Sequence, residues 1–350
     1  MKILSTILLS ALAATSAMAG GDKPIDGLSY SLPKTAVRMQ VLVEKTVTEP
    51  GQLAGFSQLY FGKAGVSTRQ TAYRIVGVSF SSEGRADADR QYTVAIDKKH
   101  SIISVDCAPD GSLLAINTKA QRAKAPAAFV PSPRKAALNP RDYMSQDILS
   151  AGNLPKMAQL VAQEIYDIRD SRSQLSRGEA DFMPKDGEQL RLMYSQLATQ
   201  EAALMQLFQG KTTVDTTATV LSFVPTKENL RPVVFRFSKS FGLCAADDYS
   251  GEPVYANIED TGSSKPLPET PAEVAKMKDD FNLGVARPGH IRITLATAEG
   301  KPLGYYDTDA AQFGTVEKLN GALFGKKFTS HIILDPATGG VVELKTEPLM

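Results

Sequence analysis

The longest regular pattern of apolar positions runs from Pro155 to Phe208 and predicts two helices. In its first half, apolar residues recur at the spacing of one helical face: Met157, Val161, Ile165, Ile168 and Leu175. The second half repeats this pattern in Leu190, Met193, Leu197, Leu204 and Phe208. Between them, Gly178 suits a helix C-terminus and Pro184 prevents the first helix from continuing. The two segments therefore predict an antiparallel helical hairpin.

Two glutamates fall on the apolar faces of these predicted helices. At 100° per residue, Glu164 lies within the apolar stripe of the first helix and Glu201 within that of the second. Placing Leu175 opposite Asp186 at the turn sets a register in which both glutamates lie about one helical turn apart. Two carboxylates at that separation can couple, which raises one pKa as an acid/base pair requires. Glu164 and Glu201 are therefore candidate catalytic residues.

A structural role for these glutamates is the alternative. Buried charges persist only when they are paired, so each glutamate can instead anchor the hairpin to a basic side chain or a free strand amide. The same register places Arg169 and Arg172 more than two turns from Glu201. A partner for Glu201 is therefore expected from a β-rich part of the chain.

The rest of the chain reads mainly as short strands. Residues 36–47 alternate apolar and polar side chains and give the clearest strand, and a short helix is expected near Leu53 to Tyr60. Further strands are expected at 71–80, 91–96, 101–106 and 112–117, and after the hairpin at 213–224, 232–237, 290–296, 330–334 and 340–345. A second short helix is expected at 272–281. These elements predict an α+β fold with two β-rich lobes joined by a central antiparallel helical hairpin.

The expected domain organisation follows the order of these elements. Residues 1–19 form a signal peptide, residues 27–118 an N-terminal β-rich lobe and residues 119–141 a linker rich in Ala, Pro and basic residues. Residues 142–210 contain the helical hairpin, and residues 211–350 form a C-terminal β-rich lobe.

The first residues predict export. Lys2 precedes an apolar run, and Ala17-Met18-Ala19 before Gly20 forms a signal-peptidase site. The mature chain is therefore expected in the periplasm or at the cell surface, without a transmembrane segment. An oxidising compartment permits Cys107 and Cys244 to form a disulfide, but the sequence does not require it, and two separate buried thiols are the alternative.

Composition and motifs exclude several classes of function. The net charge is +1, which gives no basic excess for a nucleic-acid partner. The sequence lacks the glycine-rich dinucleotide motif, the G-x-S-x-G nucleophile turn and C-x-x-C. His100, His290 and His331 are far apart, and the residues three positions after the two glutamates are Asp167 and Leu204, where a di-metal helical bundle would need histidines. No cofactor and no metal site are predicted.

Four segments together resemble an uncharacterised family of secreted bacterial proteins, domain of unknown function 4831. They are Tyr30 to Lys34, Gln163 to Arg172, Gly178 to Gly187, and Glu201 to Gly210. The resemblance covers nearly the whole mature chain and implies an exported, β-rich protein with this central hairpin. It implies no activity, ligand or catalytic residue.

Two hypotheses of function follow. In the first, the protein is a non-enzymatic binding or structural module of the bacterial envelope, with an envelope protein or a glycan as its partner. In the second, it is a hydrolase of glycan or peptide that uses Glu164 and Glu201. A deep polar cleft that reaches both glutamates would favour the hydrolase, whereas glutamates held by basic partners would favour the module.

Overall fold

A computed structural model describes the chain from residue 27 onward. The described residues are 27–95, 100–120, 122, 127–133, 136–180, 183, 186–262, 283–325 and 327–348. The predicted signal peptide and the predicted helix at 272–281 lie outside them.

Two long helices form the predicted hairpin. They are α3 (Leu154–Arg177) and α4 (Gly187–Gln209). The Asn153 side chain accepts a hydrogen bond from the backbone N–H of Lys156 and caps the start of α3, and Asp186 caps α4 in the same way through Gln189. Gly178, at φ 73°, ends α3 in the left-handed conformation that favours glycine. The α+β class and the antiparallel hairpin are confirmed.

The other helical segments are short. They are η1 (Ala54–Phe56), α1 (Ser57–Phe61), η2 (Pro140–Tyr143), α2 (Gln146–Leu149) and η3 (Gly321–Phe324). Both η1 and α1 match the short helix expected after residue 53.

The described strands form three antiparallel sheets. The first has the order β2-β1-β5, the second β10-β9-β8-β6-β7 and the third β12-β11-β4-β3. The bounds are β1 (Gly27–Glu49), β2 (Gln70–Ala95), β3 (Val105–Cys107), β4 (Leu113–Ile116), β5 (Lys211–Phe223), β6 (Val233–Ser238), β7 (Gly242–Cys244), β8 (Glu252–Gly262), β9 (Leu283–Thr297), β10 (Pro302–Leu319), β11 (Phe328–Leu334) and β12 (Val341–Pro348).

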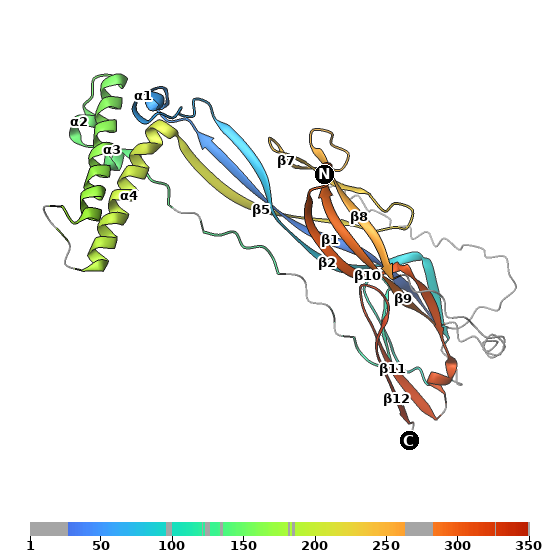
Figure 1. Cartoon of the computed structure of the whole chain (residues 1–350). Coiled ribbons are helices and arrows are strands. Elements are labelled where there is room, and N and C mark those ends of the chain that lie inside the picture. The colour runs from blue at the N-terminus through green and yellow to red at the C-terminus, as the bar shows by residue number, and fades with distance from the viewer. Residues whose placement is uncertain are drawn as a thin grey trace, which may run out of the picture.

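Strands from before and after the helices share sheets. β1 pairs with β5 from Val37↔Phe223 to Glu49↔Lys211, and β4 pairs with β11. The predicted lobe boundaries therefore describe the order of elements along the chain, whereas each of these two sheets needs strands from both sides of the hairpin. The hairpin itself lies at one end of an elongated molecule, beyond the three-stranded sheet (Figure 1).

Three separate apolar clusters hold the molecule together. The first packs the inward residues of β1, including Val37, Met39 and Val41, against the five-stranded sheet. The second lies under the four-stranded sheet, and the third joins α3, α4 and α2 to Leu53. The helical end therefore has a core of its own, which the Leu53 backbone N–H secures by donating to the Leu207 carbonyl at 2.7 Å.

The structure adds strands that the pattern did not show. The expected strand 71–80 and residues 91–95 of the expected strand 91–96 are parts of the single strand β2, and residue 96 lies outside the described residues. Residues 81–86 between them continue the pairing with β1, and the irregularity between Ser31 and Pro33 of β1 lies beyond them. Across from it, Asp87 and Arg90 form an ion pair at 2.8 Å. β7, β8 and β10 were missed. β7 has only three residues. In β10, exposed aspartates and an irregularity in its pairing with β9 interrupt the apolar pattern.

Candidate functional site

Glu201 lies at the centre of an ion-pair cluster between α3 and α4. Arg169 Nε donates to Glu201 Oε1 at 2.7 Å, and Arg172 Nη1 donates to Glu201 Oε2 at 2.5 Å. The Glu201 side chain is only 16% exposed. The Arg169 guanidinium also lies over the rings of Phe61 and Tyr166, at 5.4 Å and 5.8 Å from their centroids. Both carboxylate oxygens of Glu201 therefore have charged donors.

This cluster corrects the predicted register of the hairpin. The predicted register placed Arg169 and Arg172 more than two turns from Glu201, yet both bind it. The expectation of a partner from a β-rich lobe is therefore wrong. The register assumed parallel axes fixed at the turn, whereas α4 is inclined to α3 (Figure 1) and arginine side chains reach along the seam.

Glu164 is in a different environment from Glu201. It is half-buried on α3, beside the buried residues Val161, Ile165 and Ile168. Within the described part of the chain, the Glu164 side chain makes no hydrogen bond or ion pair. Neither glutamate is among the residues that line the three cavities described for this molecule. The structure thus gives Glu201 the basic partners of a structural anchor.

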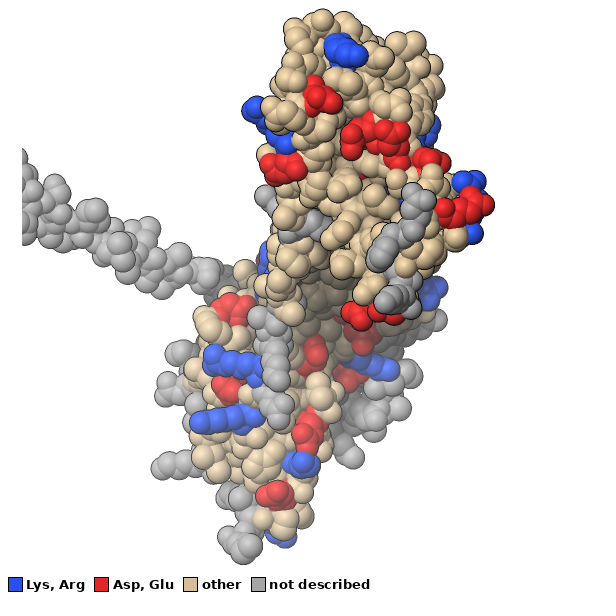
Figure 2. All heavy atoms as spheres, turned by 90° about the vertical axis from the view of Figure 1, so that its left-hand side faces the viewer, with Lys and Arg blue, Asp and Glu red and all other residues tan. Residues whose placement is uncertain are grey.

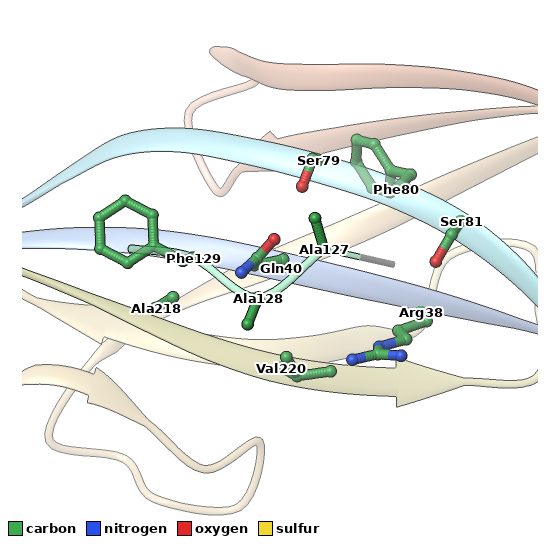
Figure 3. Close-up of a pocket in the computed structure, with 10 residues that line it drawn as sticks. All are labelled: Arg38, Gln40, Ser79, Phe80, Ser81, Ala127, Ala128, Phe129, Ala218 and Val220. Atoms are coloured by element: carbon green, nitrogen blue, oxygen red, sulfur yellow. The ribbon is translucent and has the colours of Figure 1, made fainter. Parts of the chain in front are cut away.

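A shallow groove lies on the outer face of the three-stranded sheet. Alternate side chains of β1 face opposite sides, so Arg38 and Gln40 point outward while Val37 and Met39 enter the core. With residues of β2 and β5 they border a cavity of about 350 Å³. Figure 3 shows the segment Ala127 to Phe129 crossing this face above β1 and β5.

The chemistry of this groove is that of a polar contact surface. Its floor offers the hydroxyls of Ser79 and Ser81, the amide of Gln40 and the guanidinium of Arg38, with Val220 as an apolar side. These groups donate and accept hydrogen bonds along an extended chain. Sequence reasoning missed this site, although the polar positions of the alternating stretch 36–47 were the signal for it.

A second groove lies where the three sheets meet. It has a volume of about 670 Å³, and residues of β2, β9, β10 and the turn before β12 line it. The Ser82 hydroxyl lies 2.9 Å from the Tyr306 hydroxyl and 2.8 Å from that of Thr308. The Tyr306 ring stacks on Phe80 at 5.4 Å. Side chains that are distant in sequence thus form a hydroxyl network here.

The described histidines have separate structural contacts. His290 Nδ1 lies 2.9 Å from Asp309, and His331 Nδ1 lies 2.7 Å from the Asn117 carbonyl. Among the described residues, no group of three or more His, Cys, Asp or Glu side chains could hold a metal ion.

The two cysteines lie in different sheets as free thiols, Cys107 in β3 and Cys244 in β7. The candidate disulfide between them is not formed in this structure. Burial, together with the nearby carboxylates of Asp106 and Asp110, raises the pKa of the Cys107 thiol. A raised pKa makes this thiol a poor nucleophile at neutral pH.

The surface at the helical end carries charges of both signs. Viewed from that end, Asp and Glu side chains gather over the hairpin, with Lys and Arg side chains at its margins (Figure 2). None of the helices in the described ranges is long and apolar enough to cross a membrane.

Comparison with known proteins gives one match. No curated protein and no solved structure matches the chain. A family model described as "Domain of unknown function (DUF4831)" matches residues 26–342, which include the helical hairpin and every described strand except most of β12. The chain therefore belongs to the DUF4831 family.

Proposed function

We propose that this protein is a non-enzymatic binding or structural module of the bacterial envelope. The observation that carries the proposal is the double ion pair of Glu201 with Arg169 and Arg172. Both oxygens of the carboxylate accept charged hydrogen bonds, and Glu201 lines none of the three described cavities, so it is held in ion pairs with no adjoining cavity for a substrate there. The residue acts instead as an anchor between α3 and α4.

The shape of the molecule supports a binding role. Its helical end has a core of its own beyond a three-stranded sheet, and that sheet presents a polar groove on its outer face. Such a surface suits an extended partner that hydrogen-bonds to side chains, either an envelope protein or a glycan. The export pattern at Lys2 to Ala19 supports an envelope location for this partner.

Site-specific photo-crosslinking tests this proposal. A photoreactive amino acid replaces Ser79 or Ser81 in the groove, and a matched control replaces Ser195 on the exposed surface of α4. The variants are expressed in the native host, and crosslinked products are identified by mass spectrometry. We expect one envelope component to be captured from the groove positions and not from the control.

A separate hydrolysis assay tests the hydrolase hypothesis. Purified envelope glycan and an envelope peptide mixture are incubated with the mature protein and with its Glu164→Gln and Glu201→Gln variants. We expect no product from the unmodified protein. If the unmodified protein releases a product and both variants do not, the proposal is overturned and the two glutamates are catalytic.

A further inference from the structure

β12 is the most exposed strand of the four-stranded sheet. Seven of its eight residues are exposed, with Val342 at 67% and Leu344 at 43%. One edge of β12 pairs with β11, and within the described chain no strand pairs with the other edge beyond the bridge between Gly340 and Ala286. An open edge with exposed apolar side chains is a template for pairing with a further strand.

The side chains of β12 alternate between two kinds. Glu343 and Lys345 lie on one face, and Leu344 and Thr346 lie on the other. Val342 lies in an irregularity of the β11–β12 pairing, where this alternation is interrupted. The face of Leu344 is the apolar one, because Leu344 is directly opposite the buried Ile332 of β11. An incoming strand therefore meets charge on one face of the sheet and apolar groups on the other.

This alternation is self-complementary. When two copies of β12 pair antiparallel about a two-fold axis at Leu344, Glu343 of each copy faces Lys345 of the other. The two Leu344 side chains then meet at the axis. Opposite charges that face each other across strands stabilise pairing. Glu343 and Lys345 already form an ion pair within each copy, so this register joins the two pairs into one network of four alternating charges.

The neighbouring register is disfavoured by charge. An axis at Lys345 would place Glu343 of each copy opposite Glu347 of the other, and like charges directly opposite are destabilising. The charges of β12 therefore disfavour this register, whereas an axis at Thr346 would again place Lys345 opposite a glutamate, Glu347. That axis would also bring Pro348, which has no backbone N–H, opposite Leu344, so the pairing centred on Leu344 is favoured.

The structure leaves room beside this edge. The groove of about 670 Å³ where the three sheets meet is lined by Val341 and Val342 at the start of β12 and by Val285, Pro288 and Leu319 across from them. The end of an incoming strand can enter this space. A contact made mainly by one strand is small, and interfaces below about 1,200 Å² belong to weak or transient complexes.

We propose that β12 is a self-association edge at which two copies of this chain form an antiparallel dimer centred on Leu344. The pairing joins the two four-stranded sheets into one continuous sheet, as in other cases of strand addition. This surface is separate from the outer-face groove and does not rest on the proposed function.

Charge reversal tests the register. The mature chain and its variants are studied by sedimentation velocity over a wide concentration range. We expect a concentration-dependent dimer for the unmodified chain and an increase of about tenfold or more in its dissociation constant for Lys345→Glu, because two attractive pairs become repulsive. The double variant Glu343→Lys with Lys345→Glu exchanges the charges and should restore the dimer, whereas Lys63→Glu on an exposed loop should leave it unchanged.

Crosslinking gives a second, independent readout. In a background with Cys107→Ser and Cys244→Ala, the variant Leu344→Cys places two thiols at the axis and should form a disulfide-linked dimer under mild oxidation. Val342→Cys is the matched control, since residue 342 is two positions from the axis and does not meet its own copy. A monomer at every concentration, a dimer indifferent to Lys345→Glu, or equal crosslinking at both positions would each overturn the proposal.

Discussion

Replacing Glu201 by glutamine should destabilise the helical end of the molecule. Glutamine has nearly the same shape, but it loses the charge and can accept a hydrogen bond from only one of the two arginines. Its amide N–H groups then face the other guanidinium, so two hydrogen-bond donors lie opposite each other without an acceptor. Arg172 is especially affected, because its buried Nε has no acceptor among the described residues even with Glu201 present, so the bond from Nη1 to Glu201 holds the guanidinium in place.

The loss in the free energy of unfolding depends on how buried the ion pairs are. Charge-assisted hydrogen bonds contribute about 1.5 to 3 kcal/mol each when buried, whereas exposed ion pairs contribute about 0 to 1 kcal/mol. Glu201 is 16% exposed, but Arg169 and Arg172 are 40% and 41% exposed and can turn to water. We therefore expect Glu201→Gln to cost about 1 to 2 kcal/mol.

Circular dichroism at 222 nm during denaturant unfolding measures this loss, because α3 and α4 contain most of the helical residues described. Glu164→Gln is the matched control on the facing helix and should change stability by less than about 0.5 kcal/mol. In a double-mutant cycle, Glu201→Gln and Arg172→Gln should couple by about 1 kcal/mol. Unchanged or higher stability of Glu201→Gln would refute the anchor role, since relief of repulsion between two carboxylates is the signature of an acid/base pair.

Three further predictions concern the helix, the N-terminus and a buried carboxylate. Leu197→Pro removes a backbone hydrogen bond in mid-α4 and should cost about 3 kcal/mol or more, seen as loss of the 222 nm signal; a near-native melting temperature would contradict it. Mass spectrometry of the native protein should find an N-terminus near Gly20, and an intact Met1 would show that the leader is retained. Burial alone would raise the pKa of Asp87, but hydrogen bonds from Arg90 and from backbone N–H outweigh it and lower the pKa. The stability that the Asp87 carboxylate contributes is therefore present above its ordinary pKa and is lost as pH falls through the lowered value. Asp87→Asn should make the free energy of unfolding depend less steeply on pH below about pH 4. An unchanged pH dependence would contradict this.

The sequence predicted those elements that local periodicity defines. Val161, Ile165 and Ile168 repeat at helical spacing and are buried in α3, and Val37 and Met39 alternate as inward residues of β1. Local patterns say nothing about which distant strands pair. The pairing of β1 with β5 therefore could not be read from the sequence.

The candidate site was predicted in part. Amphipathic projection placed Glu201 on the seam between the helices, and the structure holds it there. Its partners were missed because a turn fixes register only near itself, while the inclination of two long helices changes which residues meet further away. Side-chain length added to this error, since Arg169 and Arg172 reach along the seam.

The contact between Leu53 and α4 bears on how the chain folds. Thr48 and Thr212 lie side by side on β1 and β5, with hydroxyls 3.1 Å apart, yet they are 164 residues apart in sequence. Closing so long a loop costs entropy before any strand pair can form, which slows folding. The helical cluster can close this loop, because Leu53 contacts α4 just beyond the end of the β1–β5 pairing. Once the cluster has formed, β1 and β5 start from adjacent ends, and their pairing can proceed from Glu49 and Lys211 toward Val37 and Phe223 as in a local β-hairpin.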